Sequence, residues 1–353
     1  MATATVKIPS RMDLASAFDF AKELDYYCFH DSLTIDFSEK TFFAPFSMLL
    51  IASKLKFLSE KYKVNLRSYN YNNHDYLAHM GFFRMFGWNY GRDVGEAWGS
   101  QNYLPITKID RGSFYENPTD KYHELPDLIQ RNVDRIALVI SRDREKNPVL
   151  FDVLSYSIRE IMRNVFEHSR SDSLYFAAQY WPNSSKVEFA ISDFGVGIRR
   201  GLAENPNFAF DNDKDAIELS LMPSVSGKTH LPRTSENWFN SGYGLYMTSR
   251  FARSGGNFVI ASNSKAVHLS RRTKSNYNTS FPGTIIRFNI DARELFDVKS
   301  MLDQFRKEGN EIAKTISGTG SRPPSAMSLI LRRDFKLYLH VTTAGDKQWI
   351  GRP

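Results

Sequence analysis

The stretch Glu160-Ile-Met-Arg-Asn-Val-Phe-Glu-His168 decides how this chain folds and what it can bind. Apolar residues in and before it recur at helical spacing, so they predict a helix over about 148–169 with one buried stripe. The stripe consists of Leu154, Ile158, Ile161, Met162 and Val165. Glu160, Asn164 and His168 are four residues apart and stack on a second face, turned by roughly 120° from the stripe. A carboxylate, an amide and an imidazole therefore lie in one row.

This row has a chemical interpretation and a plain one. The neutral oxygen of Asn164 suits Mg²⁺, a hard ion that prefers oxygen ligands. Glu160, one turn earlier, could accept a proton from a water or a hydroxyl. A solvated helix face has the same spacing, and a Glu-x-x-x-Asn pair arises by chance about once in a chain this long. The row alone does not decide between them.

A second motif is Ile191-Ser-Asp-Phe-Gly-Val-Gly-Ile198, which follows a strand expected over 186–192. Gly195 and Gly197 permit a tight turn and the close approach of a flat ligand. The carboxylate of Asp193 can accept a hydrogen bond from an exocyclic amine such as that of adenine. A simple turn is the alternative, but Asp-x-Gly-x-Gly is expected by chance only roughly 0.1 times in such a chain.

Two further motifs lie closer to the C-terminus. Ser241-Gly-Tyr-Gly-Leu245 opens a helix expected over 245–253, and backbone N–H groups at a helix N-terminus form a seat for an anion such as phosphate. The residues of this seat would be Gly242, Tyr243, Gly244 and Leu245. Pro282-Gly-Thr284 opens a strand expected over 284–290. Each of these motifs is weak alone, since an ordinary turn would contain the same residues.

The order of the motifs resembles the GHKL superfamily, whose members include DNA gyrase B subunits, Hsp90 chaperones, histidine kinases and MutL mismatch-repair proteins. An Asn-containing helix, Asp-x-Gly-x-Gly, an insert of lid length over 199–241, a Gly-x-Gly-Leu helix and a Gly-Thr strand follow one another over about residues 126–290. The resemblance implies a Bergerat fold, a two-layer α/β sandwich with helices on one face of a mixed sheet. It also implies ATP and Mg²⁺ as cofactors.

The resemblance carries roles over to individual residues. Asp193 would bind the adenine amine, with Thr284 nearby through water, and Asn164 would hold the Mg²⁺ that bridges the phosphates. Gly195 and Gly197 would flank the adenine. The expected nucleotide-binding set is Asn164, His168, Asp193, Gly195, Gly197, Lys228, Gly242, Tyr243, Gly244, Leu245 and Thr284.

The branch of the superfamily is indicated by Glu160. It stands where gyrase-like ATPases and anti-sigma-factor serine kinases carry their general base, and its spacing to Asn164 and His168 looks closest to the serine kinases. Lys228, in the lid, could reach the γ-phosphate or could be an ordinary solvated lysine. We therefore expect an ATPase with Glu160 as catalytic residue. The alternatives are a serine/threonine protein kinase and a nucleotide-gated interaction module of a regulatory or defence system.

The first part of the chain predicts a smaller α/β unit, with strands at 32–37 and 64–69 and helices at 46–62 and 74–86. This order resembles part of a STAS domain, the anti-anti-sigma fold, in which a partner GHKL kinase phosphorylates a hydroxyl at a helix start. Thr41 and Ser47 lie nearest that position, but the surrounding loop departs from the usual sequence. A protein-docking or dimerisation domain is the alternative.

The expected organisation is two domains. Residues 1–110 would form the STAS-like or docking unit, and 111–353 the ATP-binding domain, with its lid at about 199–241 and a C-terminal extension after 290. Within that extension, 293–314 is expected to be helical and 317–325 to be a linker. The partner we expect is a protein, either a regulator or a co-encoded effector. A homodimer is the alternative that the sequence leaves undecided.

Composition narrows the class of protein. Hydrophobic residues make up 42% and charged residues 24%, as in ordinary globular chains. Cys28 is the sole cysteine, which excludes an intrachain disulfide framework and a multi-cysteine zinc site. The longest apolar-rich run, 42–52, is shorter than the ~20 residues that span a bilayer. We expect a cytoplasmic protein without a membrane segment.

The net charge of +7 raises the question of nucleic-acid binding. Residues 264–280 hold four cations and no acidic residue: Lys265, Arg271, Arg272 and Lys274. A nucleic-acid backbone could bind there, although a solvated loop between two strands is the favoured interpretation. The phosphates of ATP give the chain another reason to bind anions.

Overall fold

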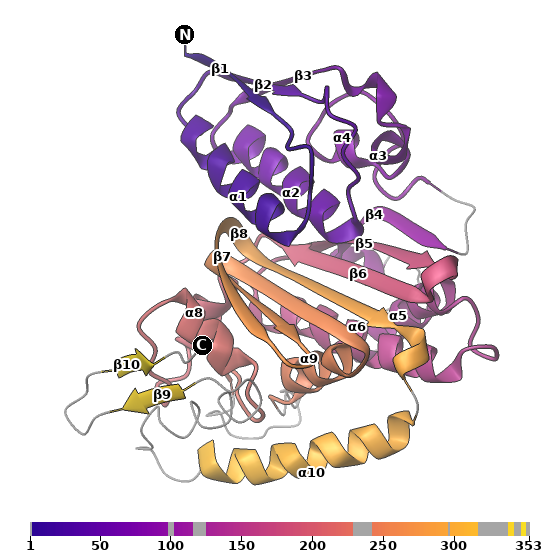
Figure 1. Cartoon of the computed structure of the whole chain (residues 1–353), viewed down its shortest axis with the longest axis vertical. Helices are drawn as coiled ribbons and strands as arrows, with labels where there is room; N and C mark the ends of the chain where they lie inside the picture. The colour runs from indigo at the N-terminus through magenta and orange to yellow at the C-terminus, as the bar shows by residue number, and fades with distance from the viewer. Residues whose placement is uncertain are drawn as a thin grey trace.

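The computed structural model describes residues 2–97, 102–115, 125–228, 242–295, 297–316, 338–341 and 347–350. It contains a three-stranded parallel sheet near the N-terminus and a five-stranded antiparallel sheet, and helices pack on both. In Figure 1 these elements form layers: the smaller sheet, the helices α1 and α2, the larger sheet, and the helices α5, α6 and α9. The expectation of a mixed α/β protein is confirmed.

The N-terminal unit is a βαβαβ arrangement. Its elements are β1 (Thr3–Lys7), α1 (Leu14–Glu23), β2 (Ser32–Asp36), α2 (Pro45–Lys61) and β3 (Asn65–Tyr69). Parallel strands need crossover connections, which α1 and α2 supply here. The sequence did not predict β1 and α1. The helix expected over 74–86 is wrong as one element, because Gly81 at φ +81° separates α3 (Asp75–His79) from α4 (Phe82–Met85).

The larger sheet has the strand order β4-β5-β6-β8-β7. Its strands are β4 (Tyr103–Asp110), β5 (Ser173–Trp181), β6 (Lys186–Asp193), β7 (Gly256–Ser270) and β8 (Lys274–Asp291). The edge strand β4 lies before residue 111, where the second domain was expected to begin. In the antiparallel pairing of β6 with β8, Asp193 at the end of β6 stands opposite Thr284.

One face of this sheet is covered by α5 (Leu125–Ser141), α6 (Pro148–His168) and α9 (Gly244–Gly255), as Figure 1 shows. Helices α6 and α9 agree with the helices expected over 148–169 and 245–253. The predicted apolar stripe of α6 is buried against Phe189, Ile191 and Phe288 of the sheet. The core on this face therefore holds the motif-bearing helix in place.

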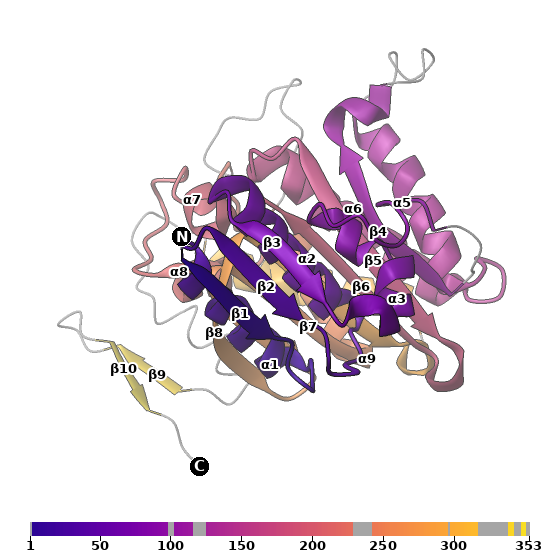
Figure 2. The same ribbon diagram turned by 90° about the horizontal axis from the view of Figure 1, so that it is seen from above.

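The opposite face of the sheet is covered by α1 and α2 of the N-terminal unit (Figure 2). Phe18 of α1 and Leu49 of α2 share one buried cluster with Ala190, Val259 and Ile285 of the sheet. Small residues such as Ala190 let a helix approach the strands closely. The two sheets consequently share a layer of helices and a continuous hydrophobic core.

The basic stretch 264–280 is not a loop, so that expectation is wrong. It forms the outer part of a long β7–β8 hairpin, with pairs such as Lys265 with Asn278 and a turn near 271–273. Ala266, Val267 and Leu269 are fully or almost fully buried there. Lys274 is also buried and forms an ion pair with Glu218. The buried alternating residues favour a strand, and Lys274 is not free to bind a nucleic acid.

Part of the expected lid over 199–241 is folded. It contains α7 (Gly197–Leu202), which begins just before it, and α8 (Asp213–Ser220), whereas 229–241 lies outside the described residues. A small cluster holds these helices together: Leu202, Ala216, Leu219, Met222 and Val225. The residues up to 228 are thus a packed subdomain.

The C-terminal extension contains α10 (Val298–Ile316), which starts later than the expected helix over 293–314. A two-stranded antiparallel pair follows, β9 (Tyr338–Val341) and β10 (Lys347–Ile350), while the expected linker 317–325 lies outside the described residues. Short 3₁₀ segments occur at Leu24–Tyr27, Tyr71–Asn73, Arg111–Tyr115, Pro182–Ser184 and Ala292–Glu294. Within the described residues, none of the helices combines the length and apolarity needed to cross a bilayer.

Candidate functional site

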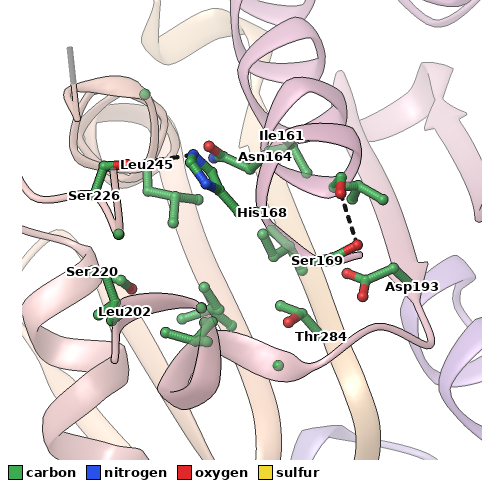
Figure 3. Close-up of a pocket in the computed structure, with 18 of the residues that line it drawn as sticks. Ile161, Asn164, His168, Ser169, Asp193, Leu202, Ser220, Ser226, Leu245 and Thr284 are labelled. Carbon is green, nitrogen blue, oxygen red and sulfur yellow. Dashed lines mark hydrogen bonds between the residues drawn. The ribbon is translucent and has the colours of Figure 1, made fainter. Parts of the chain in front are cut away.

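A pocket opens between the C-terminal half of α6, the lid helices, the start of α9, the end of β6 and the inner parts of β7 and β8 (Figure 3). The empty space between its walls, counted together with the part open to solvent, is about 740 Å³. Most of the residues expected to bind nucleotide line it: Asn164, His168, Asp193, Gly197, Gly242, Gly244, Leu245 and Thr284. Glu160, Gly195, Lys228 and Tyr243 do not line it and lie beside it.

Asp193 and Thr284 lie together at one end of the pocket (Figure 3). Asp193 is 3% exposed, and its Oδ1 accepts a hydrogen bond of 2.8 Å from the Gly195 amide. Burial raises the pKa of this carboxyl to about 7, against the lowering effect of hydrogen bonds from Gly195 and Ser169. The group can therefore exist as an acid or as a carboxylate near neutral pH, and only the carboxylate is purely an acceptor.

The turn after Asp193 is fixed against the end of α6. A Cβ on Gly195 would lie 2.0 Å from the Ser169 carbonyl oxygen, and the Val196 amide donates to that same oxygen at 2.7 Å. On β8, Gly283 has φ +114°, and a Cβ there would lie 2.2 Å from the Asp193 carbonyl oxygen. These glycines let three backbone segments meet around the buried carboxylate.

Asn164 lies on α6 and faces the pocket (Figure 3). Its Nδ2 atom is buried and has no hydrogen-bond partner among the described residues. An orphaned buried amide is costly, so a bound polar ligand would relieve it. Among the described residues, no group of three or more His, Cys, Asp or Glu is arranged to hold a metal ion.

Glu160 lies one turn before Asn164, against the start of α9. A Cβ on Gly244 would lie 2.7 Å from the Glu160 Oε2 atom, so the carboxylate and the glycine motif are in close contact. The side chain is 14% exposed, and its Oε1 lies 3.1 Å from Arg159 Nη2 and 3.7 Å from Arg163 Nη1. Both guanidinium groups hold the carboxylate at the edge of the pocket.

His168 and Lys228 stand at the lid side. Burial, and next the charge of Lys228, lowers the pKa of His168 to about 4, so the imidazole is neutral near pH 7. The His168 Nε2 atom lies 3.4 Å from the Ser226 hydroxyl. Lys228 donates from Nζ to the Glu167 carbonyl oxygen at 2.8 Å. In this conformation its ammonium group caps the end of α6 and lies beside the pocket.

The glycine motif supplies the opposite wall. Gly242 has φ +70°, and a Cβ there would lie 2.6 Å from the Ser224 carbonyl carbon. Gly244 is the first residue of α9, which has no side-chain N-cap, so its first-turn N–H groups are suited to an anion. Ser241, which opens the motif in the sequence, lies outside the described residues.

Other lining residues were not expected from the sequence. The walls are largely apolar, and their unforeseen members are Ile161, Val165, Ile198, Leu202, Val225, Ile260 and Ile286. Ile161 and Val165 belong to the stripe that the sequence assigned to the core. The adjacent Ser226 and Gly227 could have been found as a small-residue pair just before Lys228.

The hydroxyl groups considered in the N-terminal unit lie away from this pocket. Thr41 donates to the Pro9 carbonyl oxygen at 2.5 Å, and Ser47, 3% exposed, donates to the Ala44 carbonyl oxygen at 3.1 Å. Both precede or begin α2, on the opposite face of the large sheet from the pocket. In this arrangement neither hydroxyl can reach a ligand in the pocket.

Comparison with known proteins adds no relative to this description. No protein-family model matches the chain, and no curated protein and no solved structure matches it.

Proposed function

We propose that this chain is an Mg²⁺-dependent ATP-binding protein of the GHKL type, which hydrolyses ATP with Glu160 as general base. The observation that carries the proposal is the convergence of motifs distant in the sequence on one pocket: Asn164, Asp193, Gly242, Gly244 and Thr284. Chance motifs would have no reason to meet around a common cavity.

The base end of the pocket suits adenine. Ile161, Ile260 and Ile286 provide apolar surface for a flat ring, while the Asp193 carboxylate can accept a hydrogen bond from its exocyclic amine. Thr284 stands opposite Asp193 in the sheet and offers a hydroxyl as a second polar contact. A mostly apolar pocket with few fixed polar groups is typical of a cofactor site.

The opposite end suits phosphates. The first turn of α9 offers backbone N–H groups and the positive end of a helix dipole to an anion. Asn164 would hold Mg²⁺ through its amide oxygen, and the ion would offset phosphate charge during the reaction. The unpartnered Asn164 Nδ2 atom supports a polar ligand at this place.

Glu160 is suited to act on water beside the phosphate end. Its carboxylate touches Gly244 at the start of α9, so a water bound on the pocket side of this carboxylate would lie close to a terminal phosphate held there. Arg159 and Arg163 already orient the carboxylate.

The fold supports the same family. Helices α5, α6 and α9 on one face of the large sheet support a Bergerat-type sandwich, but the strands of this sheet are all antiparallel, whereas the resemblance implies a mixed sheet. The N-terminal βαβαβ unit is consistent with part of a STAS-like domain. Closure of the α7–α8 lid over nucleotide would give a protein partner, or a second copy of the chain, a surface that depends on the ligand. A serine/threonine kinase of this type would act on a hydroxyl of another chain, since Thr41 and Ser47 face away.

The test is phosphate release from MgATP by the full chain, beside Glu160→Gln, Asn164→Ala and, as a matched control, the exposed Glu145→Gln. Glu160→Gln should lower turnover by about 10²–10⁴-fold and keep nucleotide binding, because only the proton acceptor changes. Asn164→Ala should weaken MgATP binding. Turnover by Glu160→Gln equal to that of the unmodified chain would rule out the general base. Phosphate appearing on protein hydroxyls, detected by mass spectrometry, would favour the kinase.

A further inference from the structure

The C-terminal helix α10 runs along the outer side of α9 (Figure 1). Its apolar residues recur at helical spacing on the packed face: Met301, Leu302, Phe305, Ile312, Ala313 and Ile316. The Phe305 ring lies 5.4 Å from the Phe251 ring, and Arg250 stacks over Phe305 and also forms an ion pair with Glu308. These contacts anchor α10 firmly to α9.

One turn further on, α10 contacts the glycine motif itself. The Tyr243 hydroxyl donates to Asn310 Oδ1 at 2.8 Å. Gly309 is buried beneath the same ring, and a Cβ there would lie 2.9 Å from Tyr243 Cε1 and 3.0 Å from Tyr246 Cε1. A glycine inside a helix costs about 1 kcal/mol relative to alanine, so close contact with Tyr243 and Tyr246 gives a physical reason for it.

The last turns of α10 contact the lid. Ile312 and Ile316 pack against the lid cluster defined above, and Ile312 also touches the main core. Leu202 and Val225 of that cluster line the pocket. One helix therefore touches both the glycine motif and the lid, which border the phosphate end from two sides.

We propose that Gly309 and Asn310 are positioning residues of the phosphate site, a role that rests on the proposed function. Gly309 lets α10 sit against the Tyr243 ring, and Asn310 fixes its hydroxyl. Tyr243 stands between Gly242 and Gly244, so its orientation sets the direction of the backbone N–H groups at the start of α9. The base end is built by Asp193 and Thr284, which stand at facing positions of β6 and β8.

This division gives the test, which compares two ligands on the full chain by calorimetry. Adenosine fills only the base end, whereas MgATP uses both ends. Asn310→Ala should weaken MgATP binding by about 2–10-fold, the worth of one hydrogen bond, and leave adenosine binding within about twofold. Gly309→Ala should act in the same direction. Asn310→Asp keeps an acceptor for the Tyr243 hydroxyl and should restore MgATP affinity, and Lys307→Ala, exposed on the same helix, should change neither.

Three results would overturn the proposal. Unchanged MgATP affinity in both Asn310→Ala and Gly309→Ala would show that α10 does not position the phosphate site. Equal weakening of adenosine and MgATP would show that α10 only supports the fold. If the unmodified chain binds neither ligand, the proposed function falls and the positioning role falls with it.

Discussion

The Phe46 amide, in the first turn of α2, donates a hydrogen bond of 2.9 Å to Oε1 of Glu188, which lies on β6 in the middle of the large sheet. Ala44, the N-cap residue of α2, makes no side-chain cap, so Glu188 takes that role from a distant part of the chain. Its other oxygen accepts from Arg287 Nε at 2.7 Å and Asn289 Nδ2 at 3.3 Å. One buried carboxylate thus joins the N-terminal unit to the sheet.

We predict that Glu188→Ala destabilises the whole chain by about 3–5 kcal/mol, because it leaves the mostly buried Arg287 without its partner and α2 without its cap. Glu188→Gln keeps an acceptor and should cost less. Urea unfolding measures both. Glu204→Ala, which removes a partner of the exposed Arg170, is the control and should cost at most about 1 kcal/mol. A loss below that value in Glu188→Ala would contradict the prediction.

Adenosine binding should depend on pH through Asp193. Its pKa is raised to about 7, so below this pH the carboxyl holds a proton that competes with the adenine amine. Affinity should therefore rise with pH, approaching tenfold per unit below the pKa, and level off above it. Calorimetry in buffers of different ionisation enthalpy should detect proton release on binding. Asp193→Asn cannot titrate, and a pH dependence that persists in this variant would have another origin.

Gly244→Ala should separate catalysis from stability. Its new Cβ would lie 2.7 Å from Glu160 Oε2 and displace the carboxylate, so we expect turnover to fall about tenfold or more. Stability should hold or rise, because alanine favours the first turn of a helix over glycine by up to about 1 kcal/mol. Phosphate release measures the effect on turnover, and thermal unfolding measures the effect on stability. Gly112→Ala meets no atom within 4 Å and is the control; unchanged turnover in Gly244→Ala would remove Glu160 from the reaction.

The ion pair between Lys274 and Glu218 should hold α8 to the hairpin. The Lys274 side chain is 1% exposed and burial lowers its pKa, an effect that Glu218 opposes. We expect Lys274→Ala to leave Glu218 with only the more distant Lys214, 3.8 Å away on the same helix, so that amides of 213–220 exchange hydrogen at least about tenfold faster while those of α6 keep their rate. Lys265→Ala, which removes an exposed contact to Asn278, should have little effect. Unaltered exchange in α8 would mean that apolar packing alone holds it.

Local patterns predicted much of the fold and of the candidate site. The helical stripe around Asn164, the strand into Asp193 and the glycines before α9 are short-range features, and the structure brings them to one pocket. The hairpin was missed because Ala266, Val267 and Leu269 stand among basic and polar residues, and they become buried only where α8 and α1 pack against the hairpin. The position of Lys228 could not be predicted from the sequence, because its ammonium group binds the carbonyl oxygen of Glu167, which is distant in the sequence.

The strand β6 serves both sides of the molecule. Val187, Phe189 and Ile191 belong to the core beneath the pocket, while Ala190, on the alternate face, belongs to the core beneath α1 and α2. The two halves of the chain therefore share this strand as a common wall. Truncating the chain near residue 110 would expose one apolar face of the large sheet to water and promote aggregation. Each half of the chain therefore keeps water away from the apolar surface of the other half.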